Sequence, residues 1–388
     1  MGKNKYVEES VQGVRILGKD YLTYIKANII RYGINTKWKF ALRNCTRLTT
    51  QSAQNILDEY YKKERPEFAT ENIYVPQYDL QVVVPVYNVE QYLAECLSSI
   101  LNQRTNYSFE IVCVNDGAND NSANILRMFS TDSRIRIIEQ KNKGLSGARN
   151  TAIKTITGKY VMFVDSDDKL HPDAIQTLLD VALQNDADIV EGGHQEFDAE
   201  NRYSLNTHRK GIHQCDASAL YGFAWGKVIR GKALEKFCFP KGFLFEDTVM
   251  SCLLHPECKK IYTISEIVYY YRKNNRGITG TSVQKQESID TYYMMKYCLE
   301  ERVKRGQQLT LELFEQYLIS VYRNWGRTHR QPLNVQESIF VLSCDLLEKY
   351  FGQYYLNYEG RFHKILKTIE KRSFMAFVVL VENAEQFQ

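Results

Sequence analysis

The feature that most constrains this 388-residue chain is a regular alternation of strand and helix patterns between about residues 80 and 193. Leu80–Val86 and Phe109–Val114 are continuous apolar runs, typical of strands buried on both faces of a parallel sheet. Helical spacing over Val89–Leu101 separates them. Strand, helix and strand in regular succession predict an α/β fold, an open and mostly parallel sheet covered by helices on both faces.

The alternation continues along the chain. Further strands are predicted at Ile135–Glu139 and at Asp188–Gly192, with a helix over Asp173–Leu183 between them. Another helix follows the second strand, and its N-cap is expected to be Asp120 or Ser122.

Polar residues follow the ends of four predicted strands. Tyr87 and Asn88 follow the first, Asp116 the second, a loop at Gly144 the third, and Asp165–Asp168 a strand that begins at Tyr160. In open sheets of this kind, ligands bind at the carboxyl ends of the strands. The pattern therefore predicts a nucleotide site at one edge of the sheet.

The last of these clusters places three carboxylates, Asp165, Asp167 and Asp168, directly after an apolar strand. Carboxylates so close repel one another unless a cation lies among them. Mn²⁺ or Mg²⁺ is the expected cation, because both prefer oxygen ligands and share their shell with phosphates. The alternative is a solvated acidic turn.

Composition restricts the class of protein. The hydrophobic fraction of 44% and the charged fraction of 25% are those of a globular chain. Nine Cys without a CxxC pair predict buried thiols in a reducing cytosol and no zinc. No secretory signal opens the chain, and the longest strongly apolar run, Phe374–Val381, is too short to span a membrane.

The N-terminus is basic. Residues 1–65 carry 13 Lys or Arg against 6 Asp or Glu, whereas the whole chain has a net charge of +4. A helix over Val11–Ile30 would have one broad apolar face. It could dock on the rest of the protein or make peripheral contact with the inner face of a membrane. Nucleic acid is not an expected partner, since no reading motif accompanies the basic residues.

These patterns predict three regions: a basic helical extension over 1–78, a nucleotide-binding catalytic domain over 79–283, and a helical region over 284–388.

Four motifs lie at the ends of the predicted strands, one after another along the chain. They are Val83-Val-Pro85-Val86-Tyr87-Asn88, Val114-Asn-Asp116-Gly117, Asn142-Lys-Gly144 with Ala148-Arg149-Asn150, and Phe163-Val-Asp165-Ser166-Asp167-Asp168. Together they resemble the family 2 glycosyltransferases with the GT-A fold over about residues 79–280. Three later motifs are similar to motifs of family members that build bacterial surface polysaccharides. They are Trp225-Gly-Lys227, Phe245-Glu246-Asp247 and Tyr270-Tyr-Arg272.

The resemblance implies inverting transfer from a nucleotide-diphosphate sugar, usually a UDP-sugar, to a saccharide or lipid-linked saccharide, with a divalent metal. It implies that Asp167 ligates the metal and that Asp165 lies near the ribose, the sugar or the metal. The other residues expected around the donor are Pro85, Val86, Tyr87, Asn88, Asp116, Gly144, Arg149, Ser166, Asp168, Trp225, Lys227 and Arg272.

Two of these residues are expected to bind the base: Tyr87 would stack on it, and Asp116 would accept a hydrogen bond from a uracil N–H. Two others, Arg149 and Lys227, have a structural alternative. Arg149 would lie near the diphosphate or sugar, or form a salt bridge. Lys227 would contact substrate or pair with Glu246.

Other roles are less specific. Trp225 is expected to pack under the acceptor site. Arg272 and Arg276 suit a diphosphate, though they could be solvated surface side chains. His194 and His255 are expected to be hydrogen-bonded structural residues.

The expected catalytic base is Asp247, with Glu246 the next candidate. Adjacent carboxylates raise one another's pKa, and a nearby aromatic wall adds desolvation. The alternative is that both residues cap the helix that follows.

Two departures from the family pattern leave the reacting groups in place. Gly117-Ala118-Asn119-Asp120 replaces the usual Gly-Ser-Thr-Asp, and Ala152 replaces a glycine. The Gln-X-X-Arg-Trp motif of processive synthases is not seen after Asp247, which favours single transfer.

Two other functions would use some of the same residue types. A sugar-1-phosphate nucleotidyltransferase would need a Gly-rich basic loop after the first strand, and Pro85–Glu90 is not one. A non-catalytic glycan-binding relative would not need the proposed reacting groups, and their presence in this chain argues against that alternative.

Overall fold

A computed structural model describes residues 33–198, 203–274, 277–355 and 358–383. The chain forms two compact units. One is Lys63–Leu313, and the other joins residues 33–62 to the described residues from Phe314 onward. These divisions differ from the expected boundaries at residues 78 and 283, because residues 63–78 and the helix α8 (Asp290–Lys304) belong to the unit that contains the sheet.

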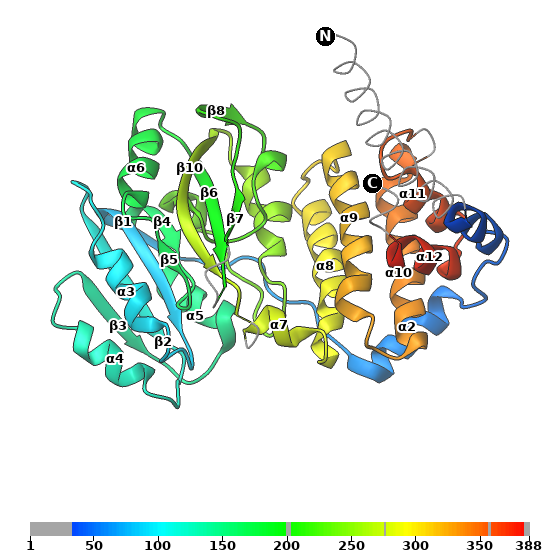
Figure 1. Ribbon diagram of the computed structural model, residues 1–388, viewed down its shortest axis with the longest axis horizontal. Helices are drawn as coiled ribbons and strands as arrows, with labels where there is room; N and C mark the ends of the chain where they lie inside the picture. Colours follow the sequence, from blue (N-terminus) through cyan, green and yellow to red (C-terminus); the bar gives the residue numbers. More distant parts are fainter. Residues whose placement is uncertain (1–32, 199–202, 275–276, 356–357, 384–388) are drawn as a thin grey trace, which may run out of the picture. The chain divides into compact units, whose positions relative to one another are not determined.

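The unit Lys63–Leu313 is built on one ten-stranded mixed sheet (Figure 1). Its strands are β1 (Ile73–Val86), β2 (Phe109–Asn115), β3 (Ile135–Glu139), β4 (Thr155–Phe163), β5 (Lys169–Leu170), β6 (Ile189–Phe197), β7 (Tyr203–Asn206), β8 (Ile212–Cys215), β9 (Lys227–Arg230) and β10 (Ile261–Arg272).

The main path of the sheet runs β3-β2-β1-β4-β9-β6-β10-β5. The first four strands are parallel to one another, and β6 is parallel to β10. Strand β9 joins these two parallel groups by pairing antiparallel with both β4 and β6. The predicted α/β fold with a mostly parallel sheet is confirmed.

The connecting helices of this unit are α3 (Leu93–Leu101), α4 (Ser122–Phe129), α5 (Gly144–Ile153), α6 (Ala174–Gln184), α7 (Ile278–Ser282) and α8. Helix α3 begins four residues later than predicted, because a turn closes from the Tyr92 N–H to the Val89 carbonyl at 2.9 Å.

The predicted N-cap of α4 was wrong, since Asn121 occupies that position. Asp120 still serves the helix start, because its Oδ1 accepts from the Ser122 N–H at 2.9 Å.

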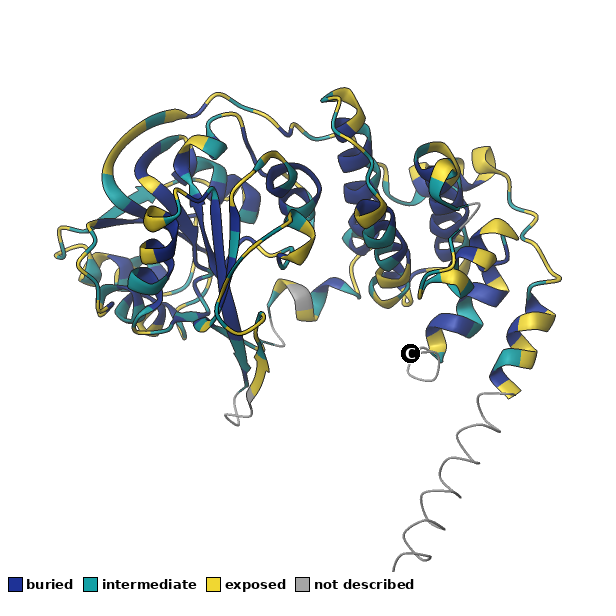
Figure 2. Ribbon diagram, turned by 90° about the horizontal axis from the view of Figure 1, so that it is seen from above, coloured by how far each residue is buried: buried dark blue, intermediate teal, exposed yellow. Residues whose placement is uncertain are grey.

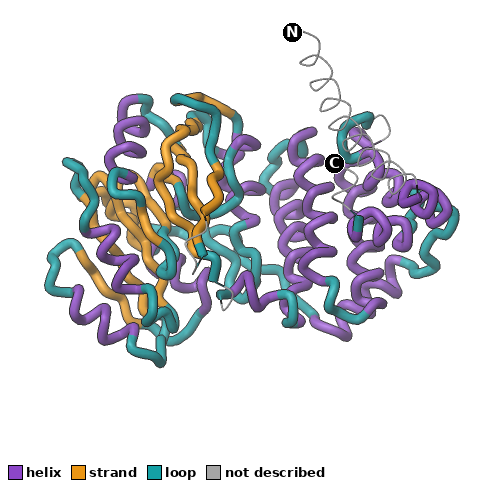
Figure 3. Tube along the Cα trace, viewed as in Figure 1, coloured by secondary structure: helices purple, strands orange, loops and turns teal. Residues whose placement is uncertain are grey.

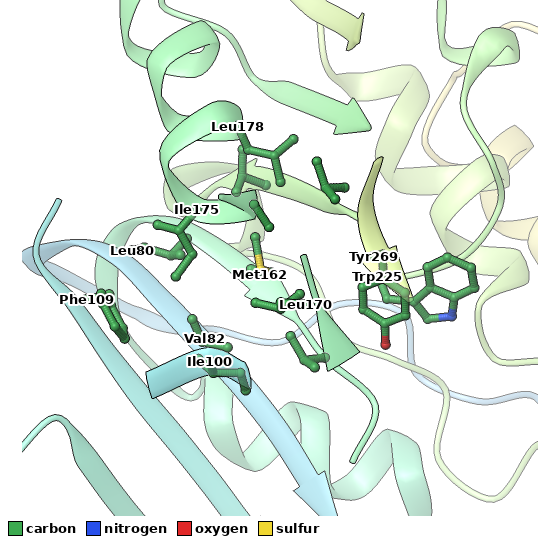
Figure 4. Close-up of a cluster of buried hydrophobic side chains, with 14 of the residues drawn as sticks. Leu80, Val82, Ile100, Phe109, Met162, Leu170, Ile175, Leu178, Trp225 and Tyr269 are labelled. Atoms are coloured by element: carbon green, nitrogen blue, oxygen red, sulfur yellow. The ribbon is translucent and has the colours of Figure 1, made fainter. Parts of the chain in front are cut away.

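The apolar strands and helices share one buried core. Leu80, Val82 and Met162 of the sheet lie in the same cluster as Ile100 of α3 and Leu178 of α6 (Figure 4). Burying one such side chain fully contributes about 1.5–3 kcal/mol. Figure 2 shows the central strands buried along their length, so the loops at their ends stand on a rigid support.

The other unit is helical in its described residues, as expected for the C-terminal region (Figure 3). Its helices are residues 33–41, α2 (Thr50–Tyr61), most of α9 (Leu311–Thr328), α10 (Leu333–Tyr355), α11 (His363–Glu370) and α12 (Phe374–Glu382). Helix α2 packs on α10, and the Thr49 hydroxyl caps α2 by accepting from the Ser52 N–H at 3.2 Å.

Three expectations concern the N-terminal helix, membrane-spanning helices and the cysteines. The predicted helix Val11–Ile30 lies outside the described residues. Within the described ranges, no helix is long and apolar enough to cross a membrane. All nine cysteines are free, and Cys96, Cys113 and Cys252 are buried as predicted.

Candidate active site

Neighbouring strands bring the predicted polar residues to one edge of the sheet. In the register of the parallel strands, Val86 at the end of β1 pairs with Asn115 at the end of β2, and Val83 pairs with Phe163 at the end of β4. Tyr87, Asp116 and the carboxylates that begin at Asp165 therefore follow adjacent strand ends.

The loop after β1 turns sharply. Pro85 and Val86 are buried in the strand, and Asn88 takes a left-handed φ of 50°. Asparagine tolerates that conformation better than most residues. Its Oδ1 accepts from the Asn119 N–H at 2.9 Å, which fixes the loop against the one after β2. Tyr87 is 45% exposed, so its ring is available to stack on a ligand.

Asp116 ties two loops together. Its side chain is buried, and Oδ1 accepts from Gln140 Nε2 at 2.6 Å and from the Lys143 N–H at 2.7 Å. Gly117 next to it has a φ of 71°, and a Cβ there would lie 3.0 Å from the Asn142 nitrogen. Glycine is therefore required for the close approach of the loop that carries Gly144.

The three carboxylates after β4 are not equivalent. Asp168 is only 1% exposed, and its oxygens accept from the Tyr269 hydroxyl at 2.8 Å and from the Arg272 N–H at 2.7 Å. Burial, with the charges of Asp167 and Asp165, raises the pKa of Asp168 well above its ordinary value. Asp168 thus supports the strand end.

Asp165 and Asp167 are half-buried and lie nearer the surface, while Ser166 between them is buried. Asp167 Oδ2 accepts from Asn274 Nδ2 at 3.1 Å. Burial and the neighbouring Asp165 raise the pKa of Asp167.

Arg149 joins this cluster to a distant segment. From α5, its Nη2 donates to Asp165 Oδ1 at 2.8 Å and its Nη1 donates to Glu246 Oε1 at 2.7 Å. Burial alone would lower the pKa of Arg149, but the Asp165 and Glu246 carboxylates raise it, so the guanidinium stays charged. The predicted salt bridge of Arg149 is therefore present, and it holds two candidate site residues in place.

The Glu246–Asp247 pair lies in a tight turn. Phe245 before it has a φ of 61°, an uncommon value for a bulky residue. The Glu246 and Asp247 carbonyls accept from the N–H groups of Val249 and Met250 at 3.2 and 2.8 Å. A π-helix, Met250–Leu254, follows. Strained residues and π-helices are both frequent at functional sites.

Glu246 has a perturbed acidity. Burial raises the pKa of Glu246, the Arg149 charge opposes that rise, Asp247 adds to it, and the resulting pKa is about 7. Burial thus outweighs the salt bridge with Arg149.

Trp225 lies in a group of stacked rings. Its indole is parallel within 12° to the Tyr269 ring at a centroid distance of 4.5 Å (Figure 4), and within 6° to the Phe223 ring at 4.4 Å. Lys227, two residues on, is fully buried and pairs with Glu191, while its Nζ donates to the Tyr221 carbonyl at 2.7 Å. The expected alternative partner, Glu246, is not the partner of Lys227.

Arg272 is held by the protein. Its Nη2 donates to Glu95 Oε2 at 2.5 Å, its Nε donates to the Asp167 carbonyl at 2.7 Å, and its guanidinium lies 4.4 Å from the Phe197 ring centroid. These contacts position the loop of Asp167. Arg276 lies outside the described residues.

His194 and His255 are buried, but the expected hydrogen bonds to their ring nitrogens are largely missing among the described residues. Both ring nitrogens of His255 and Nδ1 of His194 have no hydrogen-bond partner in the described structure. Burial lowers the pKa of each, so both rings are neutral at pH 7.

Sequence reasoning missed Tyr269. Its hydroxyl donates to Asp168 and accepts from the Asp165 N–H at 3.1 Å, so it orders both ends of the acidic cluster. The available signal was its place one residue before the Tyr270-Tyr-Arg272 motif, where alternation along a strand turns it to the other face from Tyr270.

Among the described residues, no group of three or more His, Cys, Asp or Glu side chains is arranged to hold a metal ion. The donors at the end of β4 fit a different mode, in which one or two carboxylates share a hard cation with waters and phosphates. Asp165 and Asp167 supply such oxygens. A cation would offset the burial and the Asp165 repulsion that together raise the pKa of Asp167.

Comparison with known proteins decides the family. The sequence model described as "Glycosyl transferase family 2" matches residues 81–246. The uncharacterized glycosyltransferase EpsJ of Bacillus subtilis is 31% identical over 295 residues, which are 70% of this chain and 85% of EpsJ. The chain belongs to glycosyltransferase family 2. The expected family is thereby confirmed, and with it glycosyl transfer as the general activity.

Other relatives of this family 2 glycosyltransferase differ in length. Glycosyltransferase GlyA of Streptococcus pneumoniae is 37% identical over 257 residues, which are 59% of this chain but only 37% of GlyA. In fold, the chain is similar to residues 1–349 of S. aureus TarS, whose crystal structure holds UDP-GlcNAc. The TM-score is 0.63 at 18% identity, over 80% of this chain and 92% of that one. This likeness concerns the fold alone.

Proposed function

We propose that this protein is an inverting glycosyltransferase that transfers a sugar from a UDP-sugar to a hydroxyl of a saccharide or lipid-linked saccharide in bacterial surface polysaccharide synthesis. One observation carries the proposal. The buried Arg149 guanidinium bonds Asp165 on one side and Glu246 on the other, so the acidic strand end and the Glu246–Asp247 turn belong to a single site.

The nucleotide would lie over the loops after β1 and β2. The exposed Tyr87 ring offers a stacking surface. Among the described residues, the hydrogen bonds to the Asp116 side chain, from Gln140 and Lys143, go to Oδ1, so Oδ2 is the oxygen that would accept a uracil N–H. The donor assignment depends on these residues of the chain, because the likeness to TarS concerns the fold only.

A divalent cation, Mn²⁺ or Mg²⁺, would be held by Asp167 with Asp165, and when bound it would neutralise charge on the diphosphate. The protein's own part is to keep these carboxylates oriented. Arg149 holds Asp165, Asn274 holds Asp167, and the Arg272 side chain holds the Asp167 carbonyl.

Asp247 is the proposed general base. The acceptor oxygen would attack the anomeric carbon of the donor from the face opposite the diphosphate. The new C–O bond forms as the bond to the β-phosphate oxygen breaks, the electron pair leaves with UDP, and the acceptor proton passes to the Asp247 carboxylate. Attack from the opposite face inverts the configuration. Glu246, paired with Arg149, would hold the turn that presents Asp247.

The acceptor suggests a location. A lipid-linked acceptor would bring the enzyme to the inner face of the membrane, where the basic N-terminal extension could make peripheral contact.

The proposal is tested by incubating purified protein and Mn²⁺ with a panel of UDP-sugars and saccharide acceptors and measuring UDP release. The expected result is acceptor-stimulated UDP release from at least one donor, with an inverted anomeric centre in the product by NMR. Sugar-1-phosphate turnover with UTP would instead favour a nucleotidyltransferase. UDP binding without any turnover would favour a non-catalytic relative.

A further inference from the structure

Four aromatic side chains form a layered group, here called the ring stack: Phe223, Trp225, Tyr269 and Tyr271. Phe223 and Trp225 are parallel within 6° at 4.4 Å between centroids. Trp225 in turn covers Tyr269 at 4.5 Å and Tyr271 at 5.3 Å, again nearly parallel. Tyr269 and Tyr271 are two residues apart on β10, so one indole covers both rings on the same face of that strand.

The inner end of the ring stack is fixed to the acidic cluster. Tyr269 is fully buried, and its hydroxyl bonds the Asp168 carboxylate and the Asp165 N–H. The orientation of the rings is therefore set by the same strand end that carries the proposed donor-binding carboxylates.

The segment that carries the outer ring also lies against the turn of the proposed base. A Cβ built on Gly222, the residue before Phe223, would lie 3.8 Å from the Ser251 Oγ. Ser251 belongs to the π-helix that begins three residues after Asp247. Burial lowers the pKa of Lys227, two residues after Trp225, and this lowering is opposed mainly by the Glu191 carboxylate and then by the Asp247 charge. The ring stack is thus bonded to the strand end of the donor carboxylates through Tyr269, and the segment that carries Phe223 packs against the helix that follows Asp247.

Phe223 is the exposed member of the ring stack. It is 37% exposed, whereas Trp225 and Tyr269 are buried and Tyr271 is half-buried. A phenyl side chain has no polar atom to present to water, and a single exposed apolar residue is unremarkable in itself. Here, however, the ring lies flat on the buried indole that also covers Tyr269, so it is pre-organised for a flat, partly apolar ligand.

We propose that Phe223 is the platform on which a pyranose ring of the acceptor stacks. This inference rests on the proposed function, which requires a saccharide at this site. A pyranose has faces made of C–H groups and a rim of hydroxyls. The C–H face fits the negative face of an aromatic ring, and the rim leaves the hydroxyls free to reach polar groups such as Asp247. A sugar on Phe223 would add a further layer to the ring stack.

The test compares three substitutions at Phe223 in an enzyme assay with the active UDP-sugar and a series of methyl glycosides as acceptors. Phe223→Leu keeps apolar bulk without a flat ring, Phe223→Ala removes both, and Phe223→Trp restores a flat surface. Ile212→Ala is the control. Ile212 is an exposed apolar residue of β8, and it pairs with Ile264 near the start of β10, at the other end of that strand from Tyr269 and Tyr271.

We expect the Leu and Ala variants to raise the acceptor KM about tenfold, the size of one lost stacking contact. The donor KM of both variants should stay within twofold of wild type. Phe223→Trp should have an acceptor KM close to that of wild type. Titration of the UDP complex with the same glycosides, followed by Trp fluorescence, should give a saturable change in wild type that Phe223→Leu loses.

An unchanged acceptor KM in Phe223→Leu, or equal increases in donor and acceptor KM, would overturn the inference while leaving the proposed function intact. Failure of the proposed function is a separate result, because wild type would then turn over no UDP-sugar.

Discussion

The two acidic pairs of the site, Asp165 with Asp167 and Glu246 with Asp247, share one arginine but are built differently. Asp165 and Asp167 follow a regular parallel strand, and their side chains are half-buried. Glu246 and Asp247 follow a left-handed Phe245 and precede a π-helix. The first pair thus comes from regular secondary structure, and the second from an irregular turn.

The Arg149 guanidinium therefore joins two acidic pairs with different local structures. Under the proposed function, the close carboxylates at the strand end would share a divalent cation with the donor phosphates. In the turn, burial raises the pKa of Glu246 to about 7 in spite of its salt bridge with Arg149, and under the proposed function this pair would carry out the proton transfer. If this division is correct, substitutions in the two pairs should have different consequences.

The largest effect is expected from Asp167→Ala. Transfer should fall below detection while the thermal unfolding midpoint stays close to wild type, because the substitution removes a proposed metal ligand and no core contact. UDP release as a function of Mn²⁺ concentration, with circular dichroism melting, measures both. Asp180→Ala, at an exposed carboxylate on α6, is the control. Activity equal to wild type with unchanged Mn²⁺ dependence would remove the metal role of Asp167.

Asp247→Asn should reduce kcat by about 10²–10⁴-fold, the usual contribution of a general base. The amide keeps the size of the side chain, so UDP-sugar affinity should be nearly unchanged. Steady-state kinetics and calorimetric titration with UDP separate the two quantities. Near wild-type turnover would shift the role of base to Glu246, whereas loss of folding would support the helix-capping alternative.

Glu246→Gln should change the pH dependence of stability. Because the pKa of Glu246 is raised from 4.5 to about 7 in the folded protein, the folded state binds more protons between these values. The stability from the protonated form is present below about pH 4.5 and is lost as pH rises through about 7.

Between pH 5 and pH 8, wild type should therefore lose up to about 3 kcal/mol of unfolding free energy relative to Glu246→Gln. Urea unfolding of both proteins across this range measures the difference. Glu257→Gln, at a half-exposed glutamate, is the control. Parallel curves for wild type and Glu246→Gln would show that Glu246 titrates normally.

The smallest effect concerns nucleotide choice. UDP should bind roughly tenfold more tightly than ADP or GDP, the value of about one hydrogen bond between Asp116 and uracil. Asp247→Asn should keep that ratio, because the nucleotide is proposed to lie over the loops after β1 and β2, away from Asp247. Titrations with the three diphosphates in Mn²⁺ test this, and equal affinities would mean that base recognition has been misassigned.

The order of the elements and the strand ends that carry the candidate site could be predicted from local patterns of residues. Apolar runs with period and length typical of buried strands predicted Phe109–Val114 and Ile135–Glu139 nearly to the residue. Local chemistry was sufficient there because a strand and the turn that follows it depend on contiguous residues. The same holds for the placement of Asp116 and Asp165 after their strands.

Only the tertiary structure decided which side chains meet. Arg149 and Glu246 are 97 residues apart, and Lys227 pairs with Glu191 although Glu246 was the expected alternative. Asp168 and Asp167 are adjacent, yet the fold buries one against Tyr269 and leaves the other half-buried. Such outcomes depend on how β9, β6 and β10 pack beside the first parallel group, and on the burial that this packing imposes on each charge. Residue spacing along the chain does not contain that information.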